Sequence, residues 1–97
     1  MKTTDEIIAI LRKFKDEFGE KYGIEKLGLF GSAVRGEQKE DSDVDVCVQL
    51  QTPDYFTRME IKEFLEQRLE VKVDVVSLSA MMRTLFRNHI EKDAIYI

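Results

Sequence analysis

The chain has 97 residues, of which 43% are hydrophobic and 35% are charged, a balance typical of one folded domain with a small core. Its net charge of −4 and isoelectric point near 5.0 argue against extended nucleic-acid binding on a broad basic face. No apolar run has the length of a membrane helix, and the first residues do not resemble a signal peptide. A single cysteine, Cys47, cannot form an internal disulfide, so we expect a reducing, cytoplasmic setting.

The first element is predicted to be a helix over residues 4–22. Thr3 and Glu6 have the spacing of a capping box, and Gly23 is expected to end the helix. Apolar residues recur between them at helical spacing: Ile7, Ile8, Leu11, Phe14 and Phe18.

A short strand is predicted over residues 26–30, and Gly31 interrupts it. We expect Ser32 to cap a short helix that ends near Gly36. The polar residues 37–42 that follow are typical of a loop.

Strict alternation over residues 43–50 predicts a second strand. One of its faces is apolar and consists of Val44, Val46, Val48 and Leu50. The other face carries Asp43, Asp45, Cys47 and Gln49. We expect Cys47 to be a small packing residue on that face.

A second long helix is predicted after Pro53, with Asp54 as its N-cap. Its buried stripe is expected to contain Phe56, Met59, Phe64, Leu65 and Leu69.

A strand over residues 71–76, a helix over 79–89 and a final strand over 94–97 complete the predicted elements. Val71, Val73 and Val75 share one face of the strand, and Asp74 lies on the opposite face. Helices and strands alternate without repeats or linkers, so residues 1–97 are expected to form one α/β domain, with helices packed against a short mixed sheet.

The unusual feature of the second strand is its pair of acids. Asp43 and Asp45 share a face, where their charges repel unless a cation lies between them. Mg²⁺ is commonly held by one or two carboxylates together with water and substrate phosphates. If the strand over 71–76 lies beside this one, Asp74 brings a third carboxylate to a site for two metals about 3.5–4 Å apart.

The Gly31-Ser32 pair could supply the phosphate-binding part of such a site. Glycine allows the backbone to approach a phosphate, and Ser32 adds a hydroxyl beside the N–H groups at the start of a helix. Arg35 follows one turn later and could reach a phosphate oxygen.

Each feature alone has a simpler explanation, because a Gly-Ser pair is commonly a turn and acids on a strand are commonly solvated. An EF-hand is excluded, since Val46 occupies the position of the required glycine and Thr52 that of the bidentate glutamate. There is no G-K-[ST] motif and therefore no P-loop. An aspartyl-phosphate enzyme would place its acid pair after the strand.

These residues together resemble the minimal nucleotidyltransferases of the DNA polymerase β superfamily. The resemblance rests on Gly31-Ser32, a ten-residue gap and Asp43-Val44-Asp45, within the longer motifs GSAVRGE and DSDVDV. A later VDVV segment carries Asp74. The resemblance covers nearly the whole chain, and it implies a single nucleotidyltransferase domain.

The resemblance also implies a role for each site residue. Asp43 and Asp45 would bind Mg²⁺, with two ions when nucleotide is bound, and Asp74 would complete the triad and act as the base. Gly31 and Ser32 would hold the triphosphate of ATP. The reaction would transfer AMP from ATP to a hydroxyl and release pyrophosphate.

Many chains of this size resemble the antitoxins of toxin–antitoxin pairs whose toxin is a helical HEPN ribonuclease. The resemblance implies adenylylation of a tyrosine on that partner. Two alternatives remain open: an antitoxin without catalysis that masks its partner, and nucleotidyl transfer to a small molecule. Because a core this small leaves little room for a complete substrate-binding apparatus, a second copy of the chain, as a homo-oligomer, is a further alternative to a partner protein.

Overall fold

The computed structural model describes residues 2–37, 43–78 and 84–97 of the chain. In chain order, its elements are α1 (Thr4–Tyr22), β1 (Ile24–Phe30), α2 (Ser32–Arg35), β2 (Val44–Leu50), α3 (Tyr55–Leu69), β3 (Val73–Ser77), α4 (Thr84–Asp93) and β4 (Ile95–Tyr96). The sheet has the order β3-β2-β1-β4. β1 is antiparallel to both β2 and β4, whereas β2 and β3 are parallel, so the predicted mixed α/β sheet is confirmed.

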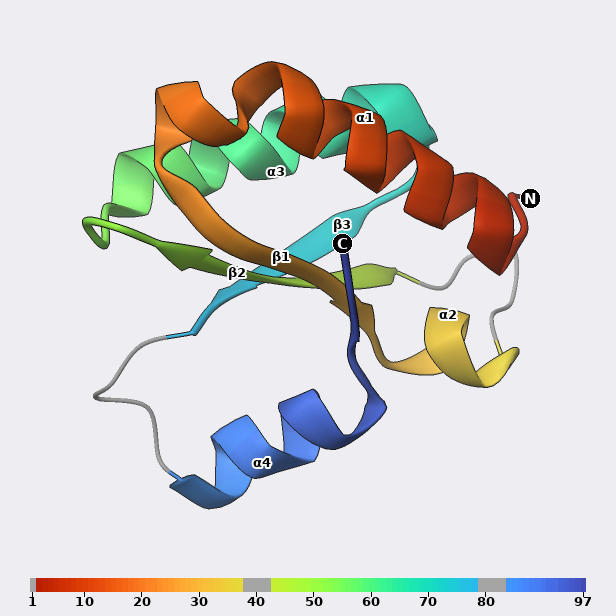
Figure 1. The fold of residues 1–97 in the computed structure, drawn as a ribbon. Helices are drawn as coiled ribbons and strands as arrows, with labels where there is room; N and C mark the ends of the chain where they lie inside the picture. The colour runs from red at the N-terminus through yellow and green to blue at the C-terminus, as the bar shows by residue number, and fades with distance from the viewer. Residues whose placement is uncertain (1, 38–42, 79–83) are drawn as a thin grey trace.

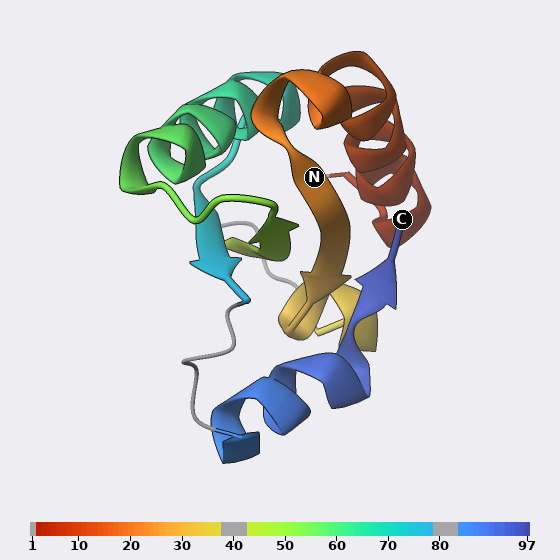
Figure 2. The ribbon, with the colours of Figure 1, turned by 60° about the vertical axis from the view of Figure 1, so that its left-hand side comes forward.

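The sheet lies between two unequal helical layers. Helices α1 and α3 cover one face, and α4 lies against the opposite face (Figures 1 and 2). The larger core cluster forms under α1 and α3; its fully buried members include Leu11, Phe14, Leu27, Leu29, Val44, Val46, Val48, Ile61 and Leu65. A second cluster beside α4 contains Cys47, Leu78 and Ile90, which confirms that Cys47 is a packing residue. Among the described residues, no helix is long and apolar enough to cross a membrane.

Helix α1 has the predicted bounds and the predicted cap. The Thr3 side chain accepts a hydrogen bond from the Glu6 N–H, and the Glu6 carboxylate accepts one from the Thr3 N–H. Gly23 ends the helix with φ of 65°, in the left-handed region that glycine adopts without strain.

Strand β1 begins at Ile24, two residues before the predicted start. Glu25 and Lys26 are both exposed, and the pairing register with β2 shifts between Ile24 and Lys26. Such an irregularity puts two exposed residues in succession and departs from the period-two alternation of a regular strand, so the sequence did not indicate the earlier start. The predicted loop over 37–42 lies outside the described residues after Glu37.

Helix α3 begins after the predicted cap, since Asp54 accepts a hydrogen bond from the Phe56 N–H at 3.2 Å. The prediction that Phe56 is buried is wrong, because its side chain is 75% exposed. The fully buried residues are Ile61, Leu65 and Leu69, one every four positions. Phe56 precedes Ile61 by five residues and is therefore rotated by about 140° from the buried stripe.

Helix α4 ends at Asp93, four residues later than predicted, and its predicted start at Ser79 lies outside the described residues. Ile90 is 1% exposed and extends the buried side of α4 beyond His89, which is exposed. The last predicted strand is confirmed but is shorter, since β4 contains two residues.

Candidate active site

The parallel pairing of β2 and β3 brings two of the predicted acids side by side. Asp45 and Asp74 are direct partners in the register of these strands, and therefore lie on the same face of the sheet. Asp43 comes just before β2 and is exposed, as is Asp74, whereas Asp45 is half-buried. The valines on either side of Asp45 are buried against α1 and α3, so the acids are on the face toward α4.

The start of β3, where Asp74 lies, is anchored from two sides. The N–H of Val73 donates to Oε2 of Glu66 at 3.0 Å, and the N–H of Val44 donates to the carbonyl of Lys72 at 2.9 Å. Glu66 also accepts from Nζ of Lys62 at 2.8 Å. Because helix α3 and strand β2 both hold this segment, the position of the Asp74 backbone is determined by the packing of the fold.

Gly31 brings the backbone of the Gly-Ser turn against Asp45. Phe30 is the register partner of Asp45, so Gly31 follows directly at the edge of the acid pair. Its φ of 79° and ψ of −150° lie in a region that is essentially restricted to glycine. A Cβ at this position would overlap Oδ2 of Asp45 and lie 3.1 Å from its Cγ. The turn can therefore approach the carboxylate this closely only because it contains glycine.

The pKa of Asp45 is raised above its ordinary value. Burial of the carboxyl group is the largest cause, and the neighbouring charges of Asp74 and then Asp43 raise the pKa further. The charge of Arg35 acts in the opposite direction and lowers it. The ionised form of Asp45 is therefore disfavoured where it lies, between its own burial and two neighbouring carboxylates.

Ser32 is the first residue of α2 rather than its cap. Gly31 occupies the N-cap position, and the N–H groups of Val34 and Arg35 donate to the Gly31 carbonyl at 3.1 and 3.3 Å. The prediction that Ser32 caps this helix is therefore wrong by one position. Ser32 still begins α2 directly after Gly31, the residue that approaches Asp45, so the first turn of the helix starts beside the acid site.

Arg35 lies between two carboxylates. Its Nε donates to Oε2 of Glu37 and its Nη1 donates to Oδ2 of Asp93, both at 3.1 Å. These bonds raise the pKa of Arg35, that to Glu37 most strongly. Sequence reasoning identified Arg35 but neither partner: Glu37 lies within the GSAVRGE motif and could have been noticed, whereas Asp93 is 58 positions away and gives no local signal.

The donor set of this site fits a hard divalent cation. Mg²⁺ prefers carboxylate oxygens, and one or two carboxylates commonly suffice when water and phosphates complete its shell. Asp45 and Asp74 provide such a pair. Burial is the main cause of the raised pKa of Asp45, and the charges of Asp74 and Asp43, which a bound cation would offset, add to it. Within the described ranges, however, no group of three or more His, Cys, Asp or Glu side chains is arranged to hold a metal ion as it stands.

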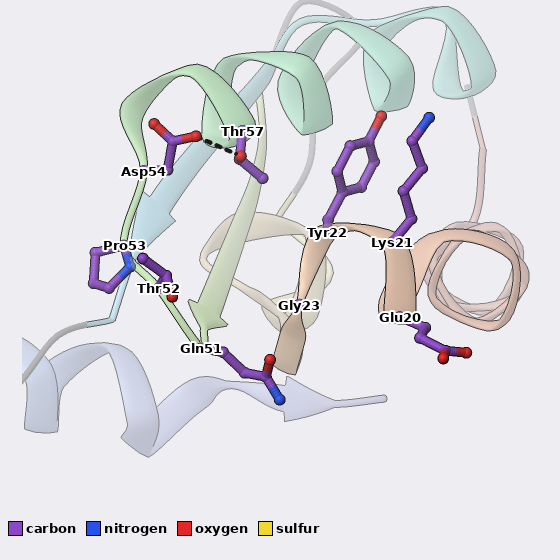
Figure 3. Close-up of a pocket in the computed structure, with 9 residues that line it drawn as sticks. All are labelled: Glu20, Lys21, Tyr22, Gly23, Gln51, Thr52, Pro53, Asp54 and Thr57. Carbon is purple, nitrogen blue, oxygen red and sulfur yellow. Dashed lines mark hydrogen bonds between the residues drawn. The ribbon is translucent and has the colours of Figure 1, made fainter.

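A separate hollow of about 500 Å³ lies at the opposite end of β1 and β2 (Figure 3). Residues 20–23, 51–54 and 57 line it, and a 2.7 Å hydrogen bond from Thr57 to Asp54 crosses one side. Asp45 is five positions from the end of β2 at Leu50, or about 17 Å along the strand. The hollow is therefore distinct from the acid site.

With this geometry described, comparison with known proteins identifies the class. The nucleotidyltransferase domain family matches residues 11–97, which include every predicted site residue. The chain belongs to this family, and its enzyme class is nucleotidyltransferase.

Among its relatives is the protein adenylyltransferase MntA of Thermococcus cleftensis, which is 38% identical over 98 residues; the match covers 100% of this chain and 98% of the relative. A solved toxin–antitoxin structure with AMP-PNP has 25% identity and a TM-score of 0.70, covering 84% of this chain and 67% of that one. The structure of a tri-AMPylated Shewanella oneidensis HEPN toxin in complex with MNT antitoxin also matches, with 22% sequence identity and a TM-score of 0.64. The match covers 93% of this chain and 66% of that one. At that identity the likeness shows the fold alone.

Proposed function

We propose that this protein is a Mg²⁺-dependent protein adenylyltransferase that moves AMP from ATP to a tyrosine hydroxyl of a HEPN-type toxin and thereby acts as its antitoxin. The observation that carries the proposal is the register pairing of Asp45 with Asp74 directly beside the Gly31 turn. This places carboxylates for a metal and a close backbone approach for phosphate at one point of the sheet.

Each residue has a chemical task in this proposal. Asp43, Asp45 and Asp74 hold Mg²⁺. Gly31 and Ser32 hold the triphosphate through backbone N–H groups and the serine hydroxyl. When bound, the metal neutralises charge on the phosphates and makes the α-phosphorus more electrophilic.

Asp74 is exposed and can receive the proton of the attacking hydroxyl. The acceptor oxygen then forms a bond to the α-phosphorus, the bond between that phosphorus and the bridging oxygen breaks, and pyrophosphate leaves. The contribution of the chain is to position these groups and to stabilise charge.

Three observations support a protein acceptor. The relative from Thermococcus cleftensis is named a protein adenylyltransferase and is nearly the same length as this chain. One solved structure at 25% identity is a toxin–antitoxin pair with AMP-PNP, and the complex with the AMPylated HEPN toxin shares the fold of this chain. A domain with so small a core also suits a substrate that brings its own binding surface.

The test is transfer from ATP labelled on the α-phosphate to the toxin encoded beside this chain, in the presence of Mg²⁺. We expect label on the toxin from α-labelled ATP and none from γ-labelled ATP, with the modified residue identified as tyrosine by mass spectrometry. Replacing that tyrosine with phenylalanine in the toxin should remove the label.

The matched variants are the double variant Asp43→Asn, Asp45→Asn and the control Asp16→Asn, which changes an exposed acid on α1. The double variant should lose transfer, and the control should keep it. Absence of label with the native chain, or full label with the double variant, would refute the proposal. Neutralisation of the toxin by the double variant would favour an antitoxin that masks its partner without catalysis.

A further inference from the structure

Two distant segments of the chain meet at one guanidinium. Arg35 ends the short helix α2 immediately after the Gly-Ser turn, and Asp93 ends α4 near the C-terminus. The 3.1 Å bond from Nη1 of Arg35 to Asp93 and the 3.1 Å bond from Nε to Glu37 join them. The last residue of α4 thus contacts a cationic side chain that adjoins the proposed nucleotide site.

The main chain that carries each carboxylate is anchored by backbone hydrogen bonds. The N–H of Glu37 donates to the carbonyl of Ser32 at 3.0 Å, which fixes Glu37 to the turn. Asp93 is held by the end of α4, where the N–H of Ala94 donates to the carbonyl of Ile90 at 3.1 Å and Ile90 is buried. The fold therefore fixes the backbone positions from which both partners reach Arg35.

The orientation of Arg35 follows from these contacts. A guanidinium is planar, so fixing Nε and Nη1 also fixes the direction of Nη2. Arg35 also lies close to the Gly31-Ser32 turn, since its backbone N–H donates to the Gly31 carbonyl at 3.3 Å. An arginine already oriented before the ligand arrives loses less conformational freedom when it binds a phosphate.

We propose that Asp93 is a positioning residue that holds Arg35 so that Nη2 is directed toward the phosphates of a nucleotide at the Gly31-Ser32 turn. This inference rests on the proposed function only in placing a nucleotide at that turn. It does not depend on which hydroxyl accepts AMP. It assigns to α4, through its last residue, a role in nucleotide affinity.

The test is the affinity for ATP with Mg²⁺, measured by calorimetric titration, together with KM and kcat for transfer. Asp93→Ala should weaken ATP binding and raise KM by about three- to fivefold, the range of a partly exposed ion pair, with little change in kcat. Asp93→Asn keeps a hydrogen-bond acceptor for Arg35 and should therefore lose less ATP affinity than Asp93→Ala. Asp16→Ala, an exposed acid on α1, should leave the affinity unchanged.

The decisive comparison is the same substitution in an Arg35→Ala background. If Asp93 acts through Arg35, then Asp93→Ala has no further effect on ATP affinity once the guanidinium is absent. An equal loss in both backgrounds would overturn the inference, because it would indicate a general structural role. Unchanged or tighter binding by Asp93→Ala would also overturn it, and tighter binding would show that Asp93 competes with phosphate.

The outcomes for the two proposals are separate. A native chain that binds ATP but transfers nothing to the toxin would refute the proposed function, while the affinity comparison would still decide the role of Asp93. A native chain that binds no ATP would refute both. Thermal unfolding followed by circular dichroism checks that each variant is folded.

Discussion

Gly31→Ala should both destabilise the fold and displace the central acid of the site. Gly31 has φ of 79° and ψ of −150°, and a residue with a side chain costs about 1–3 kcal/mol in such a region. The new Cβ would overlap the Asp45 carboxylate, and moving that side chain from its rotamer costs about 0.5–1.5 kcal/mol more. We therefore expect a loss of about 2–4 kcal/mol in the free energy of unfolding.

Gly36→Ala is the matched control. Gly36 also has a positive φ, of 72°, but a Cβ there would meet nothing within 4 Å. Its cost should therefore be the backbone term alone, about 1–2 kcal/mol. Urea denaturation followed by circular dichroism measures both variants under the same conditions.

A double-mutant cycle isolates the contact with the carboxylate. In an Asp45→Ala background, Gly31→Ala should cost less than in the native chain, since the overlapping oxygen is absent. The reasoning is refuted if Gly31→Ala costs no more than Gly36→Ala, or if its cost is the same in both backgrounds. Either result would show that the turn does not pack against Asp45.

The remaining predictions concern charge and packing. Without Mg²⁺, Asp45→Asn should stabilise the protein at pH 7, because the folded-state pKa of Asp45 is raised by burial and by neighbouring carboxylates, and its contribution to stability is therefore lost as pH rises above 3.8. Urea titrations at pH 7 with and without Mg²⁺ and ATP check this, and the ligands should stabilise only the native chain. Glu66→Gln should lower the free energy of unfolding by about 1 kcal/mol at pH 7. The difference in stability from the native chain should shrink below pH 4.5, because the folded-state pKa of Glu66 is lowered by its hydrogen bond from Lys62 and by a backbone N–H. Equal differences at pH 7 and pH 3 would contradict this. Leu65→Ala should lower the free energy of unfolding by about 3 kcal/mol, because this side chain is fully buried. Phe56→Ala should lower it by less than about 0.5 kcal/mol, because Phe56 is 75% exposed. Similar losses of stability in thermal unfolding would show that the buried stripe of α3 is misassigned.

The parts of the fold predicted from sequence were those with local causes. The alternation of valines with Asp43 and Asp45 predicted the strand and its two faces, because a period of two determines which side chains share a face. The capping box and Gly23 predicted both ends of α1. The expectation that Asp74 lies beside these acids required the two strands to pair in parallel, and the register of Asp45 with Asp74 confirms it.

The parts that were missed depend on tertiary contacts or on irregular backbone. The bulge near Glu25 hid the start of β1, because it interrupts the alternation. An aromatic side chain at the first turn of α3 suggested burial for Phe56, although its angular position faces solvent. The bond between Arg35 and Asp93 joins positions 58 apart, and neither residue carries a local signal of the other.

The most direct test of the central claim, that the acids beside Gly31 form one metal and nucleotide site, is anomalous diffraction from crystals grown with Mn²⁺ and AMP-PNP. Mn²⁺ has the same preference for oxygen ligands as Mg²⁺. We predict an anomalous peak that places Mn²⁺ at bonding distance from carboxylate oxygens of Asp43 and Asp45. The triphosphate should lie against Gly31 and Ser32. A peak elsewhere, or nucleotide bound in the hollow at residues 20–23 and 51–54, would contradict the assignment.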